Sequence, residues 1–411
     1  MTARRTIISK LIGTTLIVCT GAAGQLPPVP IPEENPITED KRVLGKVLFW
    51  DEQLSSDDTV ACGTCHLPSS GGGDPRVGRY TGVDKGTNDD VWGSPGVVHM
   101  SEAGEPLEHP MFGYESQVTD RTAPSNFGGA LWAEEIFWDG RAASKFLDPL
   151  TSEVAIASGG ALENQALAAL VNPVEMTRPG RTWSEITEKL EKIRPLTLAG
   201  NFPPDIAAAL ETNRDYPSLF EVAFGDSEIT PVRIAFAIAT YQRTLAADQT
   251  PWDHYMAGDE SALSKQEMHG WQAFQHLHCV NCHEPPLFTN NDFFNIGLRL
   301  IQFDPGRQKV TGDAEDGGEM RVPSLRNVGL RNRYMHTGEF GSLTGAINFY
   351  NNSSALPGRD AIPDLGPYVF SLTSYDSYDL NAFLKGALTD PRVAEEIFPF
   401  DRPTLSTEKD R

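Results

Sequence analysis

The sequence predicts a mainly α-helical chain that folds as two lobes connected by long loops. Apolar residues recur at helical spacing over much of its 411 residues, and no segment alternates apolar and polar residues for long enough to indicate a β domain. The pattern Cys-x-x-Cys-His also occurs twice, at Cys62–His66 and at Cys279–His283. Because the two copies lie far apart in the chain, each indicates a lobe of its own.

Residues 1–24 are typical of a secretory signal peptide. Basic residues precede a short apolar run, and small residues follow up to Gly24, after which we expect cleavage. The run is too short to cross a bilayer, and no later stretch reaches the roughly 20 apolar residues that a transmembrane segment needs. We therefore expect an exported, periplasmic protein. Lipid anchoring through Cys19 is the alternative, because the residues before it weakly resemble a lipoprotein box.

The helical pattern begins after a Pro-rich stretch at 25–37, with apolar residues recurring from Glu39 to Trp50. Further helices are predicted at 161–171, 182–193, 205–212, 216–224, 231–246, 252–277, 342–351 and 376–388. Residues 69–120 are rich in Gly and Asp and predict a long loop insertion. The expected domains are an N-terminal one at 25–246, a C-terminal one at 247–395 and a tail at 396–411.

Composition limits the partners and the disulfides. A net charge of −22 argues against nucleic acid or an anionic membrane surface as a partner. The chain has five cysteines, of which four lie in the two repeated motifs and the fifth is Cys19. No pair is left for a structural disulfide.

Cys-x-x-Cys-His is the attachment signature of a c-type haem. Cysteines three positions apart lie about one helical turn apart, so both thiols can add to the two vinyl groups of one porphyrin. The next residue, His66 or His283, then becomes the proximal iron ligand. A zinc site would bring its cysteine pairs closer in the chain, and a thiol redox pair needs a βαβ context. We expect two covalent haem groups, bound by Cys62 and Cys65 and by Cys279 and Cys282.

The motifs together resemble the bacterial di-haem cytochrome c peroxidase and MauG superfamily over residues 38–390. The segments that carry the resemblance are Leu44–Asp51, Phe137–Arg141, Asn172–Met176, Pro323–Val328 and Tyr334–Gly338. The resemblance implies two cytochrome-c-like haem domains, of which the N-terminal one is peroxidatic and the C-terminal one transfers electrons.

The resemblance also implies roles for three residues. Glu175 corresponds to the glutamate over the open face of the N-terminal haem, where a carboxylate takes and returns a proton during peroxide cleavage. Its alternative role is helix capping, with Asn172 as the N-cap. Gln165 has the spacing of the family's pocket glutamine. Trp138 matches the tryptophan between the haems, and otherwise reads as a core aromatic residue.

The resemblance places the sixth ligand of the second haem fourteen residues after His336, where many family peroxidases carry methionine. This chain has Tyr350 there, as the MauG branch does. The alternative is that Tyr350 is an ordinary helix residue and that Met335 or Met320 binds the iron. Gly82 stands where many of the peroxidases carry a histidine that blocks the first haem, so we expect that haem to be open at rest.

The resemblance implies a di-haem peroxidase that uses hydrogen peroxide. Its electrons would come from a small donor protein, a cytochrome c or a cupredoxin, or from a protein substrate as in the MauG branch, which Tyr350 favours. The alternatives are a di-haem electron-transfer cytochrome without peroxidase activity and a non-haem protein with a structural metal. The family's interdomain calcium uses an asparagine where this chain has Thr122, so calcium is only weakly implied.

Overall fold

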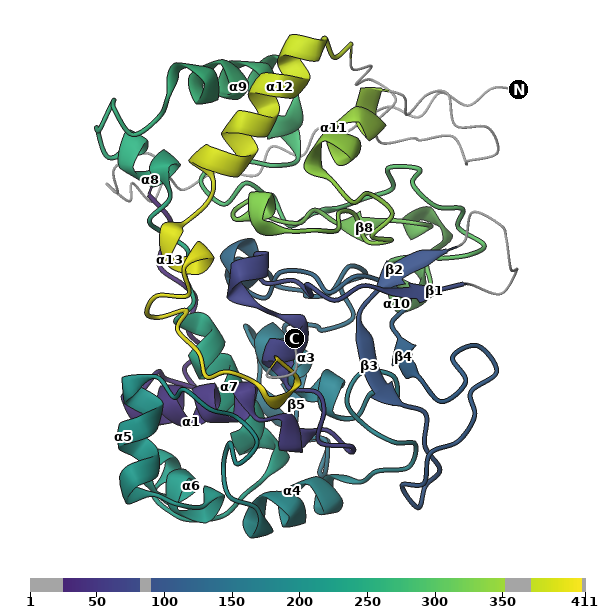
Figure 1. Cartoon of the computed structure of the whole chain (residues 1–411), viewed down its shortest axis with the longest axis vertical. Coiled ribbons are helices and arrows are strands. Elements are labelled where there is room, and N and C mark those ends of the chain that lie inside the picture. Colours follow the sequence, from purple (N-terminus) through teal and green to yellow (C-terminus); the bar gives the residue numbers. More distant parts are fainter. Residues whose placement is uncertain (1–24, 82–89, 352–370, 409–411) are drawn as a thin grey trace.

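The computed structural model describes residues 25–81, 90–351 and 371–408. Figure 1 shows α1, α4, α5 and α6 at one end of the molecule and α9, α11 and α12 at the other, as the sequence predicted for two helical lobes. The predicted signal peptide, its Cys19, and Gly82 lie outside the described residues. In the described part of the chain, no helix combines the length and apolarity that crossing a bilayer requires.

The first lobe contains seven described helices. They are α1 (Glu39–Trp50), α2 (Cys62–Cys65), α3 (Ala161–Leu170), α4 (Trp183–Lys192), α5 (Pro204–Thr212), α6 (Tyr216–Phe224) and α7 (Pro231–Arg243). Helices α1 and α7 pack closely at Gly45, where a Cβ atom would lie 1.8 Å from the Ala237 carbonyl oxygen. Glycine therefore allows this crossing, which buries Trp50 and Tyr241 in the first core.

The second lobe is built on four longer helices and a separate core. They are α8 (Pro251–Met256), α9 (Lys265–His276), α11 (Leu343–Asn351) and α12 (Ser374–Ala382), with the short helices α10 (Gln308–Thr311) and α13 (Pro391–Ala394). The single helix expected at 252–277 is two helices. Ser264 starts the second one with a capping box, because its hydroxyl accepts from the Glu267 N–H and its own N–H donates to the Glu267 carboxylate.

The described strands form four two-stranded antiparallel sheets. They pair β1 (Gly78–Tyr80) with β2 (Val91–Gly93), β3 (Pro95–Val98) with β4 (Ser116–Val118), β5 (Phe146–Leu147) with β6 (Val154–Ile156), and β7 (Phe293–Phe294) with β8 (Met320–Arg321). The insertion expected as loop thus contains two of these hairpins. It also contacts the second lobe, because the Trp92 N–H donates to the Thr337 carbonyl oxygen at 2.7 Å.

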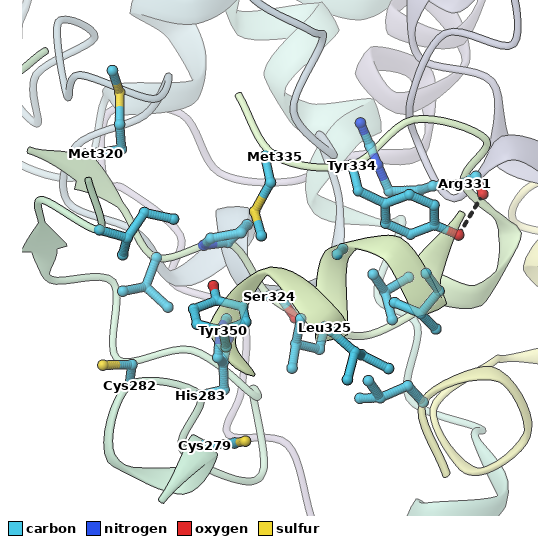
Figure 2. A pocket seen from close by; sticks show the side chains of 18 of the residues that line it. Cys279, Cys282, His283, Met320, Ser324, Leu325, Arg331, Tyr334, Met335 and Tyr350 are labelled. Atoms are coloured by element: carbon cyan, nitrogen blue, oxygen red, sulfur yellow. Dashed lines mark hydrogen bonds between the residues drawn. The ribbon is translucent and has the colours of Figure 1, made fainter. Parts of the chain in front are cut away.

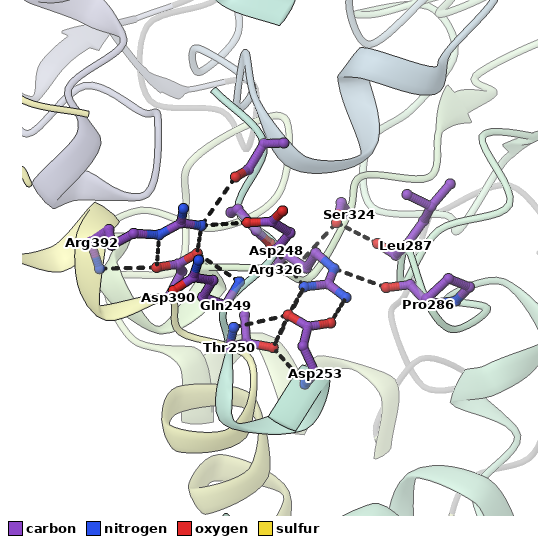
Figure 3. Close-up of polar contacts among 12 residues, drawn as sticks. Asp248, Gln249, Thr250, Asp253, Pro286, Leu287, Ser324, Arg326, Asp390 and Arg392 are labelled. Atoms are coloured by element: carbon purple, nitrogen blue, oxygen red, sulfur yellow. Dashed lines mark hydrogen bonds and ion pairs between the residues drawn. The ribbon is translucent and has the colours of Figure 1, made fainter. Parts of the chain in front are cut away.

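Two groups of ion pairs stabilise the segment that connects the lobes, at residues 247–253 (Figure 3). The Arg326 guanidinium bonds both carboxylate oxygens of Asp253, at 2.7 and 2.8 Å, and the Ala247 carbonyl oxygen at 2.9 Å. Nearby, Arg392 pairs with Asp248 and Asp390. The start of the second lobe is therefore held by its own later segments.

The C-terminal tail returns to the first lobe, where Phe400 and Leu405 lie in the core. Lys46 of α1 is fully buried and bonds the Asp401 carboxylate at 2.8 Å. The domain boundaries expected from the sequence stay predictions.

Candidate functional site

The first Cys-x-x-Cys-His motif forms the short helix α2, next to the end of α1. Gly63 lies against the Trp50 ring so closely that a Cβ atom there would come within 2.2 Å of it. The close contact with the buried Trp50 ring therefore fixes the position of α2 relative to α1. His66 follows the helix, and its Nδ1 lies 3.1 Å from the Gly72 carbonyl oxygen. Because a carbonyl oxygen only accepts, Nδ1 carries the proton and the Nε2 lone pair is available to a metal.

Glu175 lies within electrostatic range of this motif. Burial raises the pKa of the Cys62 thiol to about 12, and the Glu175 carboxylate adds to that shift. The same carboxylate contributes to the raised pKa of Cys65. Burial also raises the pKa of Glu175 itself, which the Arg141 guanidinium partly opposes. A carboxyl group with a raised pKa beside a reaction site suits proton transfer near neutral pH.

Asn172 positions Glu175 in a turn rather than in a helix. The Asn172 side chain accepts from the Val174 and Glu175 N–H groups and donates to the Glu175 carboxylate at 2.7 Å. The prediction that Asn172 caps a helix is therefore wrong, since residues 173–176 form turns and no helix begins there. The Asn172 N–H donates to the Ala169 carbonyl oxygen and not to Glu175, so the carboxylate is oriented by the Asn172 side-chain amide.

Gln165 lies on α3 and is 9% exposed. Its side-chain oxygen accepts from the Gln242 amide of α7 at 3.2 Å. This contact fixes Gln165 between two helices of the first lobe, and its pocket role stays a prediction.

The second motif borders a large cavity between the lobes (Figure 2). The cavity has about 1700 Å³ of empty space, a figure that includes space open to solvent. It brings together five of the predicted site residues, namely Cys279, Cys282, His283, Tyr350 and Trp138. Met320 and Met335 line it as well, so the alternative iron ligands also lie at this site.

His283 repeats the arrangement of His66. Its Nδ1 lies 3.1 Å from the Phe288 carbonyl oxygen, so its Nε2 is also available to a metal. Burial lowers the pKa of His283 to about 4, which keeps the imidazole neutral, the form that binds metal ions. Burial raises the pKa of the Tyr350 phenol, and the Cys279 and Cys282 thiols contribute. Coordination to a metal ion would reverse this shift by favouring the phenolate.

Trp138 lies on the cavity wall at the contact between the lobes. It is 8% exposed, and its indole N–H donates to the Thr122 carbonyl oxygen at 2.8 Å. The Thr122 N–H in turn donates to the His336 carbonyl oxygen at 2.8 Å. The position of Trp138 is thus fixed relative to the loop that carries His336, in the second lobe.

The cavity fits a haem by its donor groups. Two thiols and a neutral imidazole come from one short segment, and Nε2 of His336, also on the wall, is a buried polar atom without a hydrogen-bond partner. Calcium fits less well. Two carboxylates at the segment 121–124, those of Asp139 and Asp304, both pair with Arg121, and the Thr122 hydroxyl donates to the Met335 carbonyl oxygen.

Sequence reasoning did not identify Arg321 and Arg331 as site residues, although both line the cavity. Their even spacing with Arg326, in a loop-rich segment, was the available signal. His99 and His109 of the insertion pack against each other, with their ring centroids 5.2 Å apart.

Comparison with known proteins places this geometry in a family. Residues 39–261, more than half of the chain, match the family model for di-haem cytochrome c peroxidase. The cytochrome-c peroxidase IdrP1 of Denitromonas iodatirespirans is 29% identical over 95% of this chain and 96% of its own length. The methylamine utilization protein MauG of Methylophilus methylotrophus is 27% identical over 91% of this chain and 93% of its own.

A solved structure confirms the predicted fold. The crystal structure of a MauG-like protein associated with microbial copper homeostasis matches this one with a TM-score of 0.61 and 25% sequence identity. The match covers 94% of this chain and 98% of the other.

Proposed function

Since this chain belongs to the di-haem cytochrome c peroxidase family, we propose that it is a periplasmic peroxidase whose two covalent haem groups have different tasks. The observation that carries the proposal is the repeated His arrangement. His66 and His283 each follow a cysteine pair, and each directs its Nδ1 proton to a backbone carbonyl oxygen at 3.1 Å. Both imidazoles are therefore prepared as iron ligands through Nε2.

The haem groups supply the redox chemistry, namely the reduction of hydrogen peroxide and the storage of the oxidising equivalents. The protein supplies proton transfer and orientation. At the first site, Glu175 takes a proton from one peroxide oxygen and returns it to the other, which leaves as water. Asn172 holds the carboxylate for this transfer through its hydrogen bond of 2.7 Å. We include Gln165 as a further residue of this pocket.

At the second site, His283 and Tyr350, which line the same cavity, would hold the haem iron. A phenolate is a hard, anionic donor that favours the oxidised states of iron. Trp138 conducts charge between the two sites, for which its place between the lobes, next to His336, is suited. These roles give one open and one closed haem, which is the division of labour that a di-haem peroxidase needs.

The source of the electrons follows from the second site. A methionine as sixth ligand would favour electron delivery by a small donor protein, a cytochrome c or a cupredoxin. Tyr350 as sixth ligand favours oxidation of a protein substrate in the manner of MauG. The first 24 residues support export, and cysteine–haem ligation is completed outside the cytoplasm. Calcium is not part of the proposal.

The test uses the purified mature protein. We expect a mass that exceeds the polypeptide by two haem groups, a high-spin ferric EPR signal at rest, and rapid loss of that signal with hydrogen peroxide. Two haem groups with only low-spin signals that peroxide does not change would instead assign the protein as an electron-transfer cytochrome. A mass equal to the polypeptide alone would exclude both functions.

A further inference from the structure

The wall of the large cavity is positively charged, although the protein carries a net charge of −22. Among the described residues that line it are three arginines, Arg321, Arg326 and Arg331, and neither aspartate nor glutamate. Arg326 is neutralised by the two hydrogen bonds to Asp253. The other two arginines are not neutralised in this way.

Arg321 is 4% exposed and belongs to β8. Its guanidinium donates to the Phe137 carbonyl oxygen at 3.3 Å and to the Asn291 side-chain oxygen at 2.8 Å. Both partners are neutral, and no carboxylate within the described ranges lies at ion-pair distance from it. Burial lowers the pKa of Arg321 to about 10, and no nearby negative charge opposes this shift.

Arg331 is held in the same way, but between the two lobes. Its guanidinium donates to the carbonyl oxygens of Ala123 and Arg333, at 2.8 and 3.3 Å. A Cβ atom on Gly73 would lie 2.6 Å from its Nη1, so it packs directly on the loop that follows the first motif. The acid that acts on it, Asp74, is itself paired with Arg76 at 2.8 Å.

A buried charge without a counter-charge costs several kcal/mol, roughly, and proteins retain such groups where a ligand supplies the opposite charge. A haem carries two propionate carboxylates, on the half of the macrocycle opposite its two vinyl groups. In Figure 2, Cys279 and Cys282 lie on the lower side of the cavity and Arg331 lies on the upper side. The cavity thus has its thiols and this free cation at opposite ends.

We propose that Arg321 and Arg331 are the anion-binding residues of this cavity, and that they pair with propionate carboxylates of bound haem. The inference rests on the haem binding of the proposed function. It adds that the positive charges of two arginines balance the negative charges of propionates. For Arg321 the carboxylate belongs to the haem on Cys279 and Cys282. For Arg331, which touches both the cavity and the first-motif loop, it belongs to either haem, and the experiment distinguishes them.

The experiment measures the reduction potentials of both haem groups in the purified holoprotein, by spectroelectrochemical titration without peroxide. The variants are Arg321→Gln and Arg331→Gln, which remove the charge, and Arg321→Lys and Arg331→Lys, which keep it. Arg333→Gln is the matched control. It removes a charge two positions from Arg331, on a side chain that stacks on Trp92 and is not among the described lining residues. Intact mass gives the number of haem groups in each variant.

Each Gln variant should lower the potential of one haem, because loss of a nearby cation disfavours the reduced iron. The Lys variants should lower it less, and Arg333→Gln should leave both potentials unchanged. For Arg331→Gln, the haem whose potential falls is the one that supplies the carboxylate. Loss of one haem in a Gln variant, restored in the Lys variant, supports the same pairing.

Unchanged potentials in both Gln variants, with two haem groups bound, would overturn the proposal and leave the peroxidase function untouched. Equal effects of Gln and Lys at both positions would also overturn it, because packing rather than charge would then be responsible. Absence of haem from the unaltered protein would contradict the proposed function itself.

Discussion

The ring centroids of Trp138 and His336 lie 6.1 Å apart, with their planes inclined at 60°. Trp138 follows the first-lobe insertion, and His336 belongs to a second-lobe loop. One residue links the two, because the Thr122 carbonyl oxygen accepts from the Trp138 indole and the Thr122 N–H donates to the backbone carbonyl oxygen of His336. The contact therefore joins the two lobes through buried residues rather than through surface side chains.

Trp138→Phe tests whether this contact conducts charge. We expect the reaction of the first haem with peroxide to keep its rate. The oxidation of the second haem that follows should slow at least about tenfold, a barrier increase of about 1.4 kcal/mol. Stopped-flow absorption at wavelengths that distinguish the haem groups measures both. Trp132→Phe is the control, because that indole donates to the Pro28 carbonyl oxygen, away from the cavity. Equal slowing in both variants would argue for a general loss of stability.

Glu175→Gln tests the proposed proton transfer. The glutamine keeps the oxygen that accepts from Asn172 and loses the base, so the rate of reaction with peroxide should fall by about 10²- to 10⁴-fold with both haem groups still bound. Glu188→Gln, on the exposed face of α4, should leave the rate unchanged. In the unaltered protein the rate should fall as the pH drops through the raised pKa of Glu175. A pH-independent rate would remove Glu175 as the base.

The same pKa shift predicts a change in stability with pH. Because burial raises the folded-state pKa of Glu175 above its unfolded value, the folded protein binds this proton more tightly. The contribution of Glu175 to the free energy of unfolding therefore decreases as the pH rises from the unfolded to the folded pKa. Glu175→Gln should gain stability relative to the unaltered protein between acidic and neutral pH. Thermal unfolding at several pH values measures the difference, and a constant difference would contradict the assignment.

Helical spacing and capping residues predicted a helix well where both signals agree. Helix α1 has the predicted bounds, because Thr38 caps it and its apolar residues follow helical spacing. The break between α8 and α9 was missed, although Ser264 and Glu267 have the spacing of a capping box. The apolar pattern continues across the break, so periodicity alone predicts one helix where the structure has two.

The haem-binding residues could be proposed from the sequence, because haem attachment requires two cysteines and a histidine at a fixed spacing. Arg321 and Arg331 could not, because they differ from Arg326 only in their surroundings. Asp253 forms an ion pair with Arg326 and not with the other two. Such a difference depends on contacts between segments about 70 residues apart, which no local pattern records. The same holds for Trp138, whose partner Thr122 was noted only as a departure from a motif.

Asp253→Asn should destabilise the second lobe. It would leave the buried Arg326 guanidinium without its counter-charge, and breaking such a pair costs about 3–5 kcal/mol. Asp248→Asn is the matched control, because that carboxylate is 52% exposed and pairs with Arg392 near the surface, where pairs contribute about 0–1 kcal/mol. Denaturant unfolding of both variants measures the difference. Similar losses in the two would show that the Arg326 pair is not special.

Tyr350→Phe tests the ligand of the second haem. Removal of the phenol oxygen should abolish the low-spin ferric EPR component of that haem and convert it to a high-spin form, since His283 would then be its only protein ligand. Met335→Leu and Met320→Leu are the matched variants, because both methionines line the same cavity and are the alternative ligands. They should leave the low-spin component unchanged. If Met335→Leu or Met320→Leu removes it and Tyr350→Phe does not, the second iron has a thioether ligand, and the preference for a protein substrate over a small electron donor loses its basis.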